Sequence, residues 1–326
     1  MEKQYIELSD LYKVKGIGKK TIQRIKKTLL HNKKDESKEI VYPTEFNLPL
    51  NNFYISESVL WMQKNMPSNY VDLTVTSPPY DNLRTYKGYN FDYKTMLKEL
   101  YRVTKVGGIV VWVVGDATIK GSETGTSFRQ ALYAKEVGFN LHDTMIYEKT
   151  SQYPANVRYQ QDFEYMFVFS KGKPNTFNPI YTLKTIKEIK KIIKGSFKHR
   201  ESTYRNINGI TEKLDDNALK RLEKSNKIPI KTMSNIWKCN AGYMISTSDK
   251  IAFNHPATFP EQLAQDHIIS WSNESDIIFD PMVGSGTTAK MAWLNNRKFI
   301  GVDCSEEYIN DICIPRLKKY GWDCGD

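Results

Sequence analysis

Short apolar runs alternate with amphipathic stretches along residues 50–170 of this 326-residue chain. Runs such as VDLTVT (71–76) and GGIVVWVVGD (107–116) have the length and β-branched content of buried strands. Between them, apolar residues recur at helical spacing. Helices are expected at SVLWMQKNM (58–66), YKTMLKELYRVTKV (93–106) and SFRQALYAKEVGF (127–139). Strands that alternate with helices predict a mostly parallel sheet.

Two further strands, LHDTMIYEK (141–149) and FEYMFVFSKG (163–172), are separated only by a polar loop, which predicts an antiparallel strand pair. The helix–strand alternation stops at residues 171–250 and returns after residue 250. There the pattern predicts helices at 260–272, 288–296 and 306–319 and strands at 276–280 and 298–303. We therefore expect one α/β domain that is interrupted by an insertion.

The positive charge of the chain is unevenly placed. The whole sequence carries a net charge of +10. Residues 171–250 contain 18 Lys and Arg against 7 Asp and Glu, and residues 1–40 contain 11 against 6. The rest of the chain is therefore mildly acidic. A charged stretch is often only a solvated face, but two basic segments beside an acidic remainder favour contacts with a phosphate backbone.

Residues 1–40 form a basic segment whose apolar residues repeat at helical spacing. Gly16 and Gly18 interrupt this repeat and indicate two short helices joined by a tight hairpin. The pattern resembles the helix-hairpin-helix element of DNA-binding proteins, in which backbone N–H groups reach a phosphate. The alternative is a plain basic helical cap.

Several classes of protein are disfavoured by the sequence. No apolar run approaches the 18 residues of a membrane span, and the start, MEKQYIELSD, lacks a signal-peptide pattern, so we expect a cytoplasmic protein without a membrane partner. The four cysteines form no CxxC pair. We therefore expect neither a metal site nor a disulfide framework.

A glycine-rich turn, FDPMVGSGTT (279–288), lies between a predicted strand and a predicted helix. Glycines there let a ligand approach the backbone, and the helix start offers free N–H groups. Asp303 ends the next strand, 23 residues after Asp280. That spacing suits a carboxylate that binds ribose hydroxyls in a nucleoside-binding unit. The alternative is an ordinary tight turn.

A second turn, Ser77-Pro78-Pro79-Tyr80, follows the strand 71–76. Two prolines remove two N–H donors and restrict φ, so carbonyls of the turn can face a ligand amino group. Tyr80 has a ring that suits stacking on a planar group. By itself, this motif would favour a rigid strand-to-loop turn.

Together and in this order, the two motifs resemble the beta class of S-adenosylmethionine-dependent DNA amino-methyltransferases, over residues 50–320. YRVTKVGGIVVW, EYMFVFSKG and HPATFPEQLAQDHI resemble further family elements. The resemblance implies a Rossmann-like methyltransferase fold. Its expected parts are a helical extension (1–40), a catalytic half (50–170), a basic target-recognition insertion (171–250) and a cofactor-binding half (251–326).

The resemblance also implies roles for individual residues. Ser77 and the Pro78 carbonyl would accept hydrogen bonds from the target amine, and Tyr80 would stack on a flipped-out base, with Tyr147 or Tyr153 on its other face. The implied catalytic residues are Ser77, Pro78, Pro79 and Tyr80. The implied residues for the cofactor, S-adenosylmethionine, are Glu57, Thr258, Phe259, Pro260, Glu261, Phe279, Asp280, Pro281, Gly284, Ser285, Gly286, Thr287 and Asp303. Glu57 stands where family members often carry Asp.

Ser at the first position of the turn favours cytosine-N4 as the target in this family, with adenine-N6 as the alternative. The expected partner is double-stranded DNA, bound by a monomer or homodimer. The expected role is protection of host DNA beside a cognate restriction endonuclease, with an orphan or phage enzyme as the alternative. A methyltransferase for RNA or protein glutamine fits the motif order less well, and a DNA-binding module without activity leaves both turns unexplained.

Overall fold

The computed structural model describes residues 40–79, 91–149, 158–183, 230–239 and 244–323. The chain divides into two compact units, residues 1–42 and 43–326. All of the described helices and strands belong to the second unit. The predicted helix-hairpin-helix segment, Tyr80 and Tyr153 lie outside the described residues.

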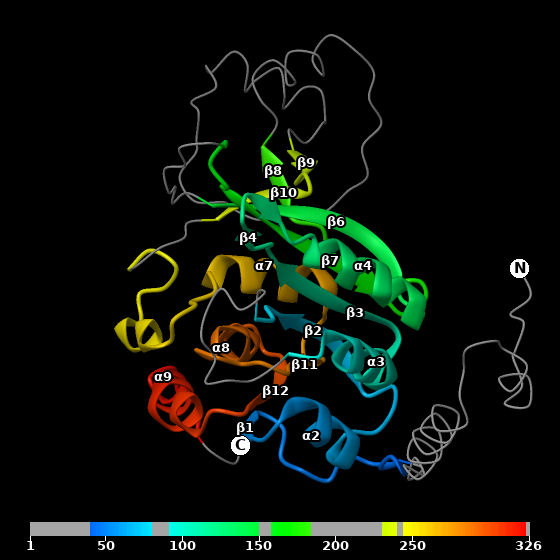
Figure 1. Cartoon of the computed structure of the whole chain (residues 1–326). Coiled ribbons are helices and arrows are strands. Elements are labelled where there is room, and N and C mark those ends of the chain that lie inside the picture. The colour runs from blue at the N-terminus through cyan, green and yellow to red at the C-terminus, as the bar shows by residue number, and fades with distance from the viewer. Residues whose placement is uncertain (1–39, 80–90, 150–157, 184–229, 240–243, 324–326) are drawn as a thin grey trace, which may run out of the picture. The chain divides into compact units, whose positions relative to one another are not determined.

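A central sheet of eight strands organises the second unit (Figure 1). The strand order is β1-β12-β11-β2-β3-β7-β6-β10. Neighbouring strands are parallel except at β7, which pairs antiparallel with both β3 and β6. The predicted α/β fold, with its mostly parallel sheet and an antiparallel pair formed by β6 and β7, is confirmed, and β7 adds a second antiparallel pairing with β3. The strands are β1 (Asn52–Ile55), β2 (Val71–Thr76), β3 (Thr104–Val114), β6 (Asn140–Lys149), β7 (Phe163–Ser170), β10 (Ile236–Cys239), β11 (Ile277–Asp280) and β12 (Lys298–Asp303).

Helices cover both faces of this sheet (Figure 1). One face packs against α2 (Ser58–Asn65), α3 (Tyr93–Val103) and α4 (Thr126–Val137). The other face packs against α7 (Glu261–Trp271), α8 (Thr287–Leu294) and α9 (Ile314–Lys318). Because side chains of a strand point alternately to its two faces, β3 supplies both layers with apolar residues.

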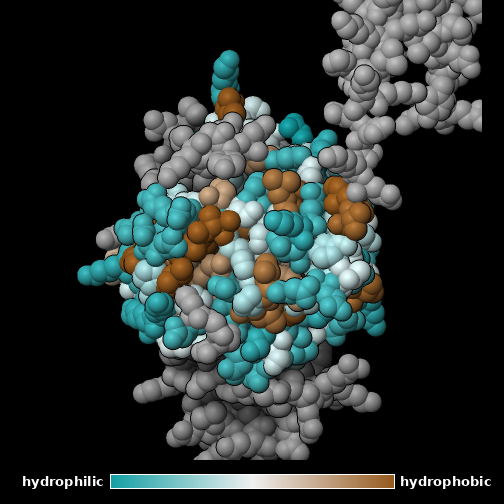
Figure 2. Space-filling model, turned by 90° about the horizontal axis from the view of Figure 1, so that it is seen from below, coloured by the Kyte–Doolittle hydropathy of each residue, from teal (hydrophilic) through white to brown (hydrophobic). Residues whose placement is uncertain are grey.

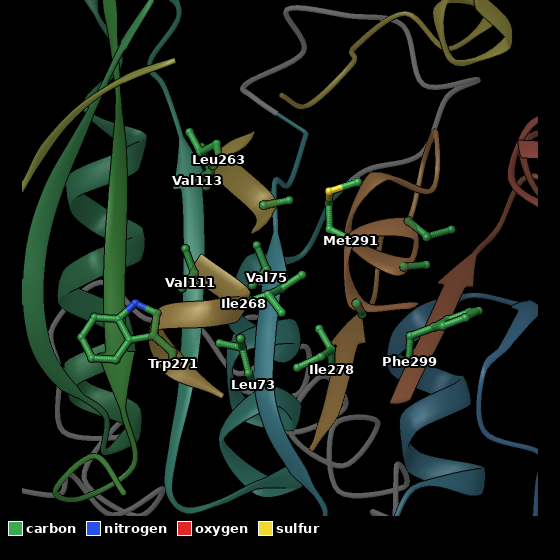
Figure 3. Close-up of a cluster of buried hydrophobic side chains, with 14 of the residues drawn as sticks. Leu73, Val75, Val111, Val113, Leu263, Ile268, Trp271, Ile278, Met291 and Phe299 are labelled. Atoms are coloured by element: carbon green, nitrogen blue, oxygen red, sulfur yellow. The ribbon is translucent and has the colours of Figure 1, made fainter. Parts of the chain in front are cut away.

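Alternate residues of β3 illustrate this division of the core. Val111 and Val113 face α7, whereas Val110 and Trp112 face the layer of α3 and α4. Figure 3 shows the first layer, in which Leu263 and Ile268 of α7 pack over the strands. Complete burial of one such side chain contributes about 1.5–3 kcal/mol to folding. The two apolar layers therefore hold the central sheet in place from both faces.

The structure differs from the predicted elements at a few places. The helix predicted over 93–106 ends at Val103, and residues 104–106 begin β3, so that part of the prediction was wrong. The β-branched Thr104 and Val106 favour the strand, and the Thr104 hydroxyl bonds back to the Leu100 carbonyl at 2.6 Å. The predicted last helix contains a π-helical segment, Tyr308–Cys313, before α9.

Short elements that the sequence analysis did not predict complete the fold. A hairpin joins β4 (Thr118–Ile119) to β5 (Ser122–Glu123), and β8 (Tyr181–Leu183) pairs with β9 (Ile230–Thr232). Residues Lys250–Asn254 form a 3-10 helix, η2. Strand β10 lies within the basic range 171–250 but joins the main sheet beside β6. Two or three residues of pairing are too short to give a periodic signal in the sequence.

The surface seen from below interleaves hydrophilic and hydrophobic residues (Figure 2). Among the described residues, no helix combines the length and apolar character needed to cross a membrane.

Candidate active site

The carboxyl ends of the parallel strands border a cavity of about 1280 Å³. In α/β folds this edge of the sheet is where ligands bind. Most of the predicted site residues line this one cavity, although they come from segments far apart in the sequence. Those that line it are Glu57, Ser77, Pro78, Pro79, Thr258, Phe259, Pro260, Asp280, Gly284, Ser285, Thr287 and Asp303.

The glycine loop, residues 281–286, joins β11 to α8 at the cavity. Gly284 has φ +49° and Gly286 has φ +80°, both in the left-handed region that favours glycine. A Cβ atom on Gly284 would lie 2.9 Å from Nε2 of His255. The glycine is therefore required by both its backbone conformation and the close approach of the His255 ring.

Asp303 ends β12, and its carboxylate holds the glycine loop in place through hydrogen bonds to the backbone. Its Oδ2 accepts a hydrogen bond from the Gly284 N–H at 2.9 Å, and its Oδ1 accepts one from the Ser305 N–H at 2.9 Å. The carboxylate is buried but still lines the cavity. Each oxygen keeps a second lone pair, so this carboxylate is held in place by the backbone and can accept two further hydrogen bonds.

Asp280 ends β11 beside the same loop. Its Oδ1 accepts hydrogen bonds from the Thr76 hydroxyl at 2.8 Å and from the Met282 N–H at 3.1 Å. Burial raises the pKa of Asp280 to about 6, and the hydrogen bond from Thr76 only partly opposes that rise. The cavity thus contains a carboxyl group that changes charge near neutral pH.

Glu57 lies at the start of α2. Its Oε1 accepts from the Val59 N–H at 3.1 Å and its Oε2 accepts from the Leu60 N–H at 2.7 Å. The residue therefore caps α2 and faces the cavity at the same time.

The Ser77-Pro78-Pro79 turn forms another part of the cavity lining, directly after β2. Side chains from β6 and β7 line the cavity too, among them Tyr147 and the ion pair of Lys149 and Glu164, with Nζ and Oε1 3.0 Å apart. Burial, followed by the nearby Glu164 charge, raises the pKa of Tyr147 well above its usual value. Tyr147 is therefore a neutral aromatic group with little of its surface exposed.

Four predicted cofactor residues do not line the cavity. The Phe279 ring is fully buried and stacks on Trp61, with ring centroids 6.3 Å apart. The Pro281 carbonyl accepts a hydrogen bond from the Ser58 hydroxyl. Gly286 starts α8, where an added Cβ would lie 3.1 Å from the Cys313 sulfur. Glu261 points into a cluster of buried ions instead.

The cavity also contains residues that the sequence analysis did not single out. His255 and Tyr308 both line it and form an edge-to-face pair, with ring centroids 4.5 Å apart. His255 is the first residue of the HPATFPE segment. That segment resembles a family element, but nothing in the sequence marked His255 itself as a residue of the site. Tyr308 lies in the π-helical segment, which has no sequence signature.

Comparison with known proteins identifies the family to which the chain belongs. Residues 71–313 match the DNA methylase family N6_N4_Mtase. The orphan methyltransferase M.BamHII of Bacillus amyloliquefaciens is 57% identical over 260 residues, which cover 79% of this chain and 93% of that protein. The type II methyltransferase M.HpaI of Haemophilus parainfluenzae is 27% identical over 76% of this chain and 68% of its own length.

Solved structures agree on the fold. The PvuII DNA methyltransferase, described as cytosine-N4-specific, superposes with a TM-score of 0.54 at 18% identity, covering 86% of this chain and 94% of that one. A DNA modification methylase of Thermus thermophilus, TTHA0409, solved with S-adenosyl-L-methionine, gives 0.53 at 20% identity, covering 82% and 93%.

This chain belongs to the DNA methylase family. The resemblance drawn from its two turns is confirmed, and the match disfavours both a methyltransferase for RNA or protein and a DNA-binding module without activity.

Proposed function

We propose that this protein is a site-specific methyltransferase that uses S-adenosyl-L-methionine to methylate the N4 amine of cytosine in double-stranded DNA. The observation that carries the proposal is the meeting of Ser77-Pro78-Pro79 with the glycine loop and Asp303 in one cavity. A methyl donor and an exocyclic amine must meet in one site, and this cavity brings together a set of residues suited to each.

The cofactor supplies an electrophilic methyl group on a sulfonium centre. Asp303 is suited to the ribose hydroxyls, because its carboxylate is held by two backbone N–H groups and still faces the cavity. The glycine loop lets the methionine part approach the backbone closely, and Asp280 offers a negative charge near a cationic ligand once it is ionised. Glu57 borders the same cavity and is assigned to the adenosine end.

The catalytic turn acts on the target amine. Exocyclic amines are weak nucleophiles because their lone pair is delocalised into the ring. Ser77 Oγ and the Pro78 carbonyl accept hydrogen bonds from the amine, which favours a more pyramidal nitrogen and orients its lone pair. This is catalysis by positioning and by preorganised hydrogen bonds, without a covalent enzyme intermediate.

The base must leave the duplex to reach such a cavity. Tyr147 lines the cavity and is assigned to one face of the flipped base, and Tyr80, outside the described residues, to the other. The basic ranges 1–40 and 171–250 supply contacts to the DNA backbone, and the second range contains the target-recognition region.

Cytosine-N4 is proposed over adenine-N6 because the turn begins with Ser77. The description of the PvuII enzyme, which shares the fold, agrees with this choice. For the biological role, the relatives' names support two settings. M.HpaI is a type II methyltransferase, as expected for an enzyme paired with a restriction endonuclease, whereas M.BamHII is an orphan methyltransferase.

Methylome sequencing of DNA from cells that express the protein tests the proposal. The expected result is N4-methylcytosine at one short recognition sequence, absent from cells that express Ser77→Ala. Finding only N6-methyladenine would overturn the choice of base, and finding no modified base would overturn the activity.

A further inference from the structure

Four charged side chains form a buried ion cluster behind the cavity: Asp249, Glu261, Lys290 and Arg316. Lys290 Nζ lies 2.7 Å from Asp249 Oδ2 and 2.6 Å from Glu261 Oε1. Arg316 contacts the same two oxygens, at 3.0 Å and 2.6 Å. The side chains of Asp249, Lys290 and Arg316 are at most 2% exposed. Each cation therefore binds both carboxylates and is itself shielded from solvent, whereas the Glu261 side chain is 21% exposed.

The two carboxylates bracket a segment that lines the cavity. We call residues 250–260, between Asp249 and Glu261, the strap. Its cavity-lining members are Phe253, His255, Pro256, Ala257, Thr258, Phe259 and Pro260. Lys290 belongs to α8 and Arg316 to α9, which pack on the same side of the sheet as α7 (Figure 1). Both ends of the strap are thus tied to the same two cations.

Arg316 also holds the glycine loop. Its Nη1 donates to the Ser285 carbonyl at 2.7 Å and to Thr287 Oγ1 at 3.0 Å, and both of these residues line the cavity. The strap and the loop touch directly as well, since His255 lies where a Gly284 side chain would be. One planar guanidinium therefore fixes the loop and both ends of the strap relative to one another. A lysine ammonium group has fewer donors and no planar fork, so it could not make all of these contacts.

Stability alone does not account for such a cluster. Buried ion pairs often contribute no more to folding than apolar side chains of similar volume, because desolvation offsets their attraction. Burial alone would raise the pKa values of Asp249 and Glu261, yet hydrogen bonds, first of all from Lys290, hold both below their usual range. Both carboxylates are therefore ionised and paired across the neutral pH range.

We infer that Arg316 and Lys290 are positioning residues for the methyl donor, and that the ion cluster sets the separation of strap and glycine loop. Neither cation lines the cavity, so both act through the strap and the loop. The inference rests on the proposed use of S-adenosyl-L-methionine. It also assigns Glu261 to this cluster instead of to direct contact with the ligand.

Arg316→Lys tests the inference, since it keeps the charge but removes the planar fork. We expect the Kd for S-adenosyl-L-methionine, measured by calorimetry on the full chain, to rise at least about 10-fold. Methyl transfer at saturating cofactor should fall by less than about threefold. This split between affinity and turnover is the readout that a merely structural role would not produce.

Arg297→Lys is the matched control. Arg297 is also buried, but it donates to the Asn295 carbonyl at 2.6 Å and the Ser272 carbonyl at 2.8 Å, and it does not line the cavity. Its variant should lose stability while the cofactor Kd stays within about twofold. Lys319→Ala removes an exposed partner that lies 2.8 Å from Asp249, and it should also leave the Kd within about twofold.

Hydrogen exchange of the free proteins gives an independent readout. Strap and glycine-loop amides should exchange faster in Arg316→Lys than in Arg297→Lys. If Arg316→Lys does not fold, Glu261→Gln is the second variant, with the same expected pattern at reduced size. Unchanged Kd and unchanged strap exchange in the folded variant would overturn the inference. If the wild type binds no S-adenosyl-L-methionine, the proposed function fails, while the exchange comparison still decides whether the cluster holds the strap.

Discussion

The glycine loop and the Ser77–Pro79 turn face the same cavity but are held by different interactions. The cofactor wall, made of residues 280–286 with Asp303, is fixed by carboxylates that bind backbone N–H groups and by Arg316 behind it. The turn wall, Ser77–Pro79, continues the buried strand β2, and its prolines restrict the backbone. Buried carboxylates and Arg316 therefore hold the first wall, whereas the second is a proline-stiffened continuation of β2 that the hydrogen bond from Thr76 to Asp280 joins to the first.

This difference predicts that changes in the two walls affect different measured quantities. Changes in the cofactor wall should alter ligand affinity and stability, because they break hydrogen bonds that shape the binding surface. Changes in the turn wall should alter methyl transfer, because the proposed function assigns Ser77 and Pro78 to the target amine and not to the cofactor. Each of the following variants tests that prediction.

The largest effect is expected for Ser77→Ala. Loss of one preorganised hydrogen-bond partner in an active site typically lowers kcat by about 10²–10³-fold. Radiolabelled methyl transfer to duplex DNA should fall by that factor, while the Kd for S-adenosyl-L-methionine changes by less than about twofold. A Kd that rises as much as the rate falls would contradict the separation of the two walls.

Asp280→Asn should change how stability depends on pH. The pKa of Asp280 is about 6 in the folded protein, above the usual value of 3.8, so folding favours its protonated form. Below about pH 4 the carboxyl group is protonated in both the folded and the unfolded protein and does not change the free energy of unfolding. As pH rises from there through 6, the unfolded protein ionises first, so the folded protein loses stability. The wild type should lose up to about 3 kcal/mol relative to Asp280→Asn between pH 4 and 7. Parallel urea-unfolding curves for the two proteins across this range would disprove it.

Asp303→Ala should weaken cofactor binding by about 30-fold, because hydrogen bonds to a charged group contribute about 1.5–3 kcal/mol. Asp303→Asn keeps one acceptor oxygen and should show a smaller loss. Calorimetry gives both values. Equal affinity of Asp303→Ala and wild type would remove Asp303 from the cofactor wall.

Gly284→Ala should give the smallest effect, a loss of about 1–2 kcal/mol in the free energy of unfolding. The cost has two sources, the φ of +49° and the approach of the His255 ring. In a His255→Ala background only the first source remains, so the cost should shrink. An equal cost in both backgrounds would show that the ring yields without resistance.

The sequence predicted the elements that carry strong periodic signals. VDLTVT became β2 with the predicted bounds, and the strands around the glycine loop formed where expected. Asp280 and Asp303 are the last residues of two parallel strands, which is why their positions at one sheet edge were predictable. The antiparallel pair of β6 and β7 followed from the polar loop between two strands.

The ion cluster had no comparable signal. Asp249, Glu261, Lys290 and Arg316 are separated by up to 67 residues, and a charged residue in a helix normally predicts a solvated face. Glu261 lies in α7, Lys290 in α8, Arg316 in α9 and Asp249 directly before η2, so only the tertiary structure brings the four together. Glu261 shows the consequence. Its place beside HPATFP predicted contact with the cofactor, but its carboxylate binds Lys290 and Arg316.

Methyl transfer in a purified system tests the central claim most directly. The protein, S-adenosyl-L-methionine with a labelled methyl group, and duplex DNA are incubated together, and the DNA is then digested to nucleosides for mass spectrometry. The label is expected in N4-methylcytosine. Label only in N6-methyladenine would contradict the choice of base, and label in no nucleoside would show that the cavity is not a site of DNA methylation.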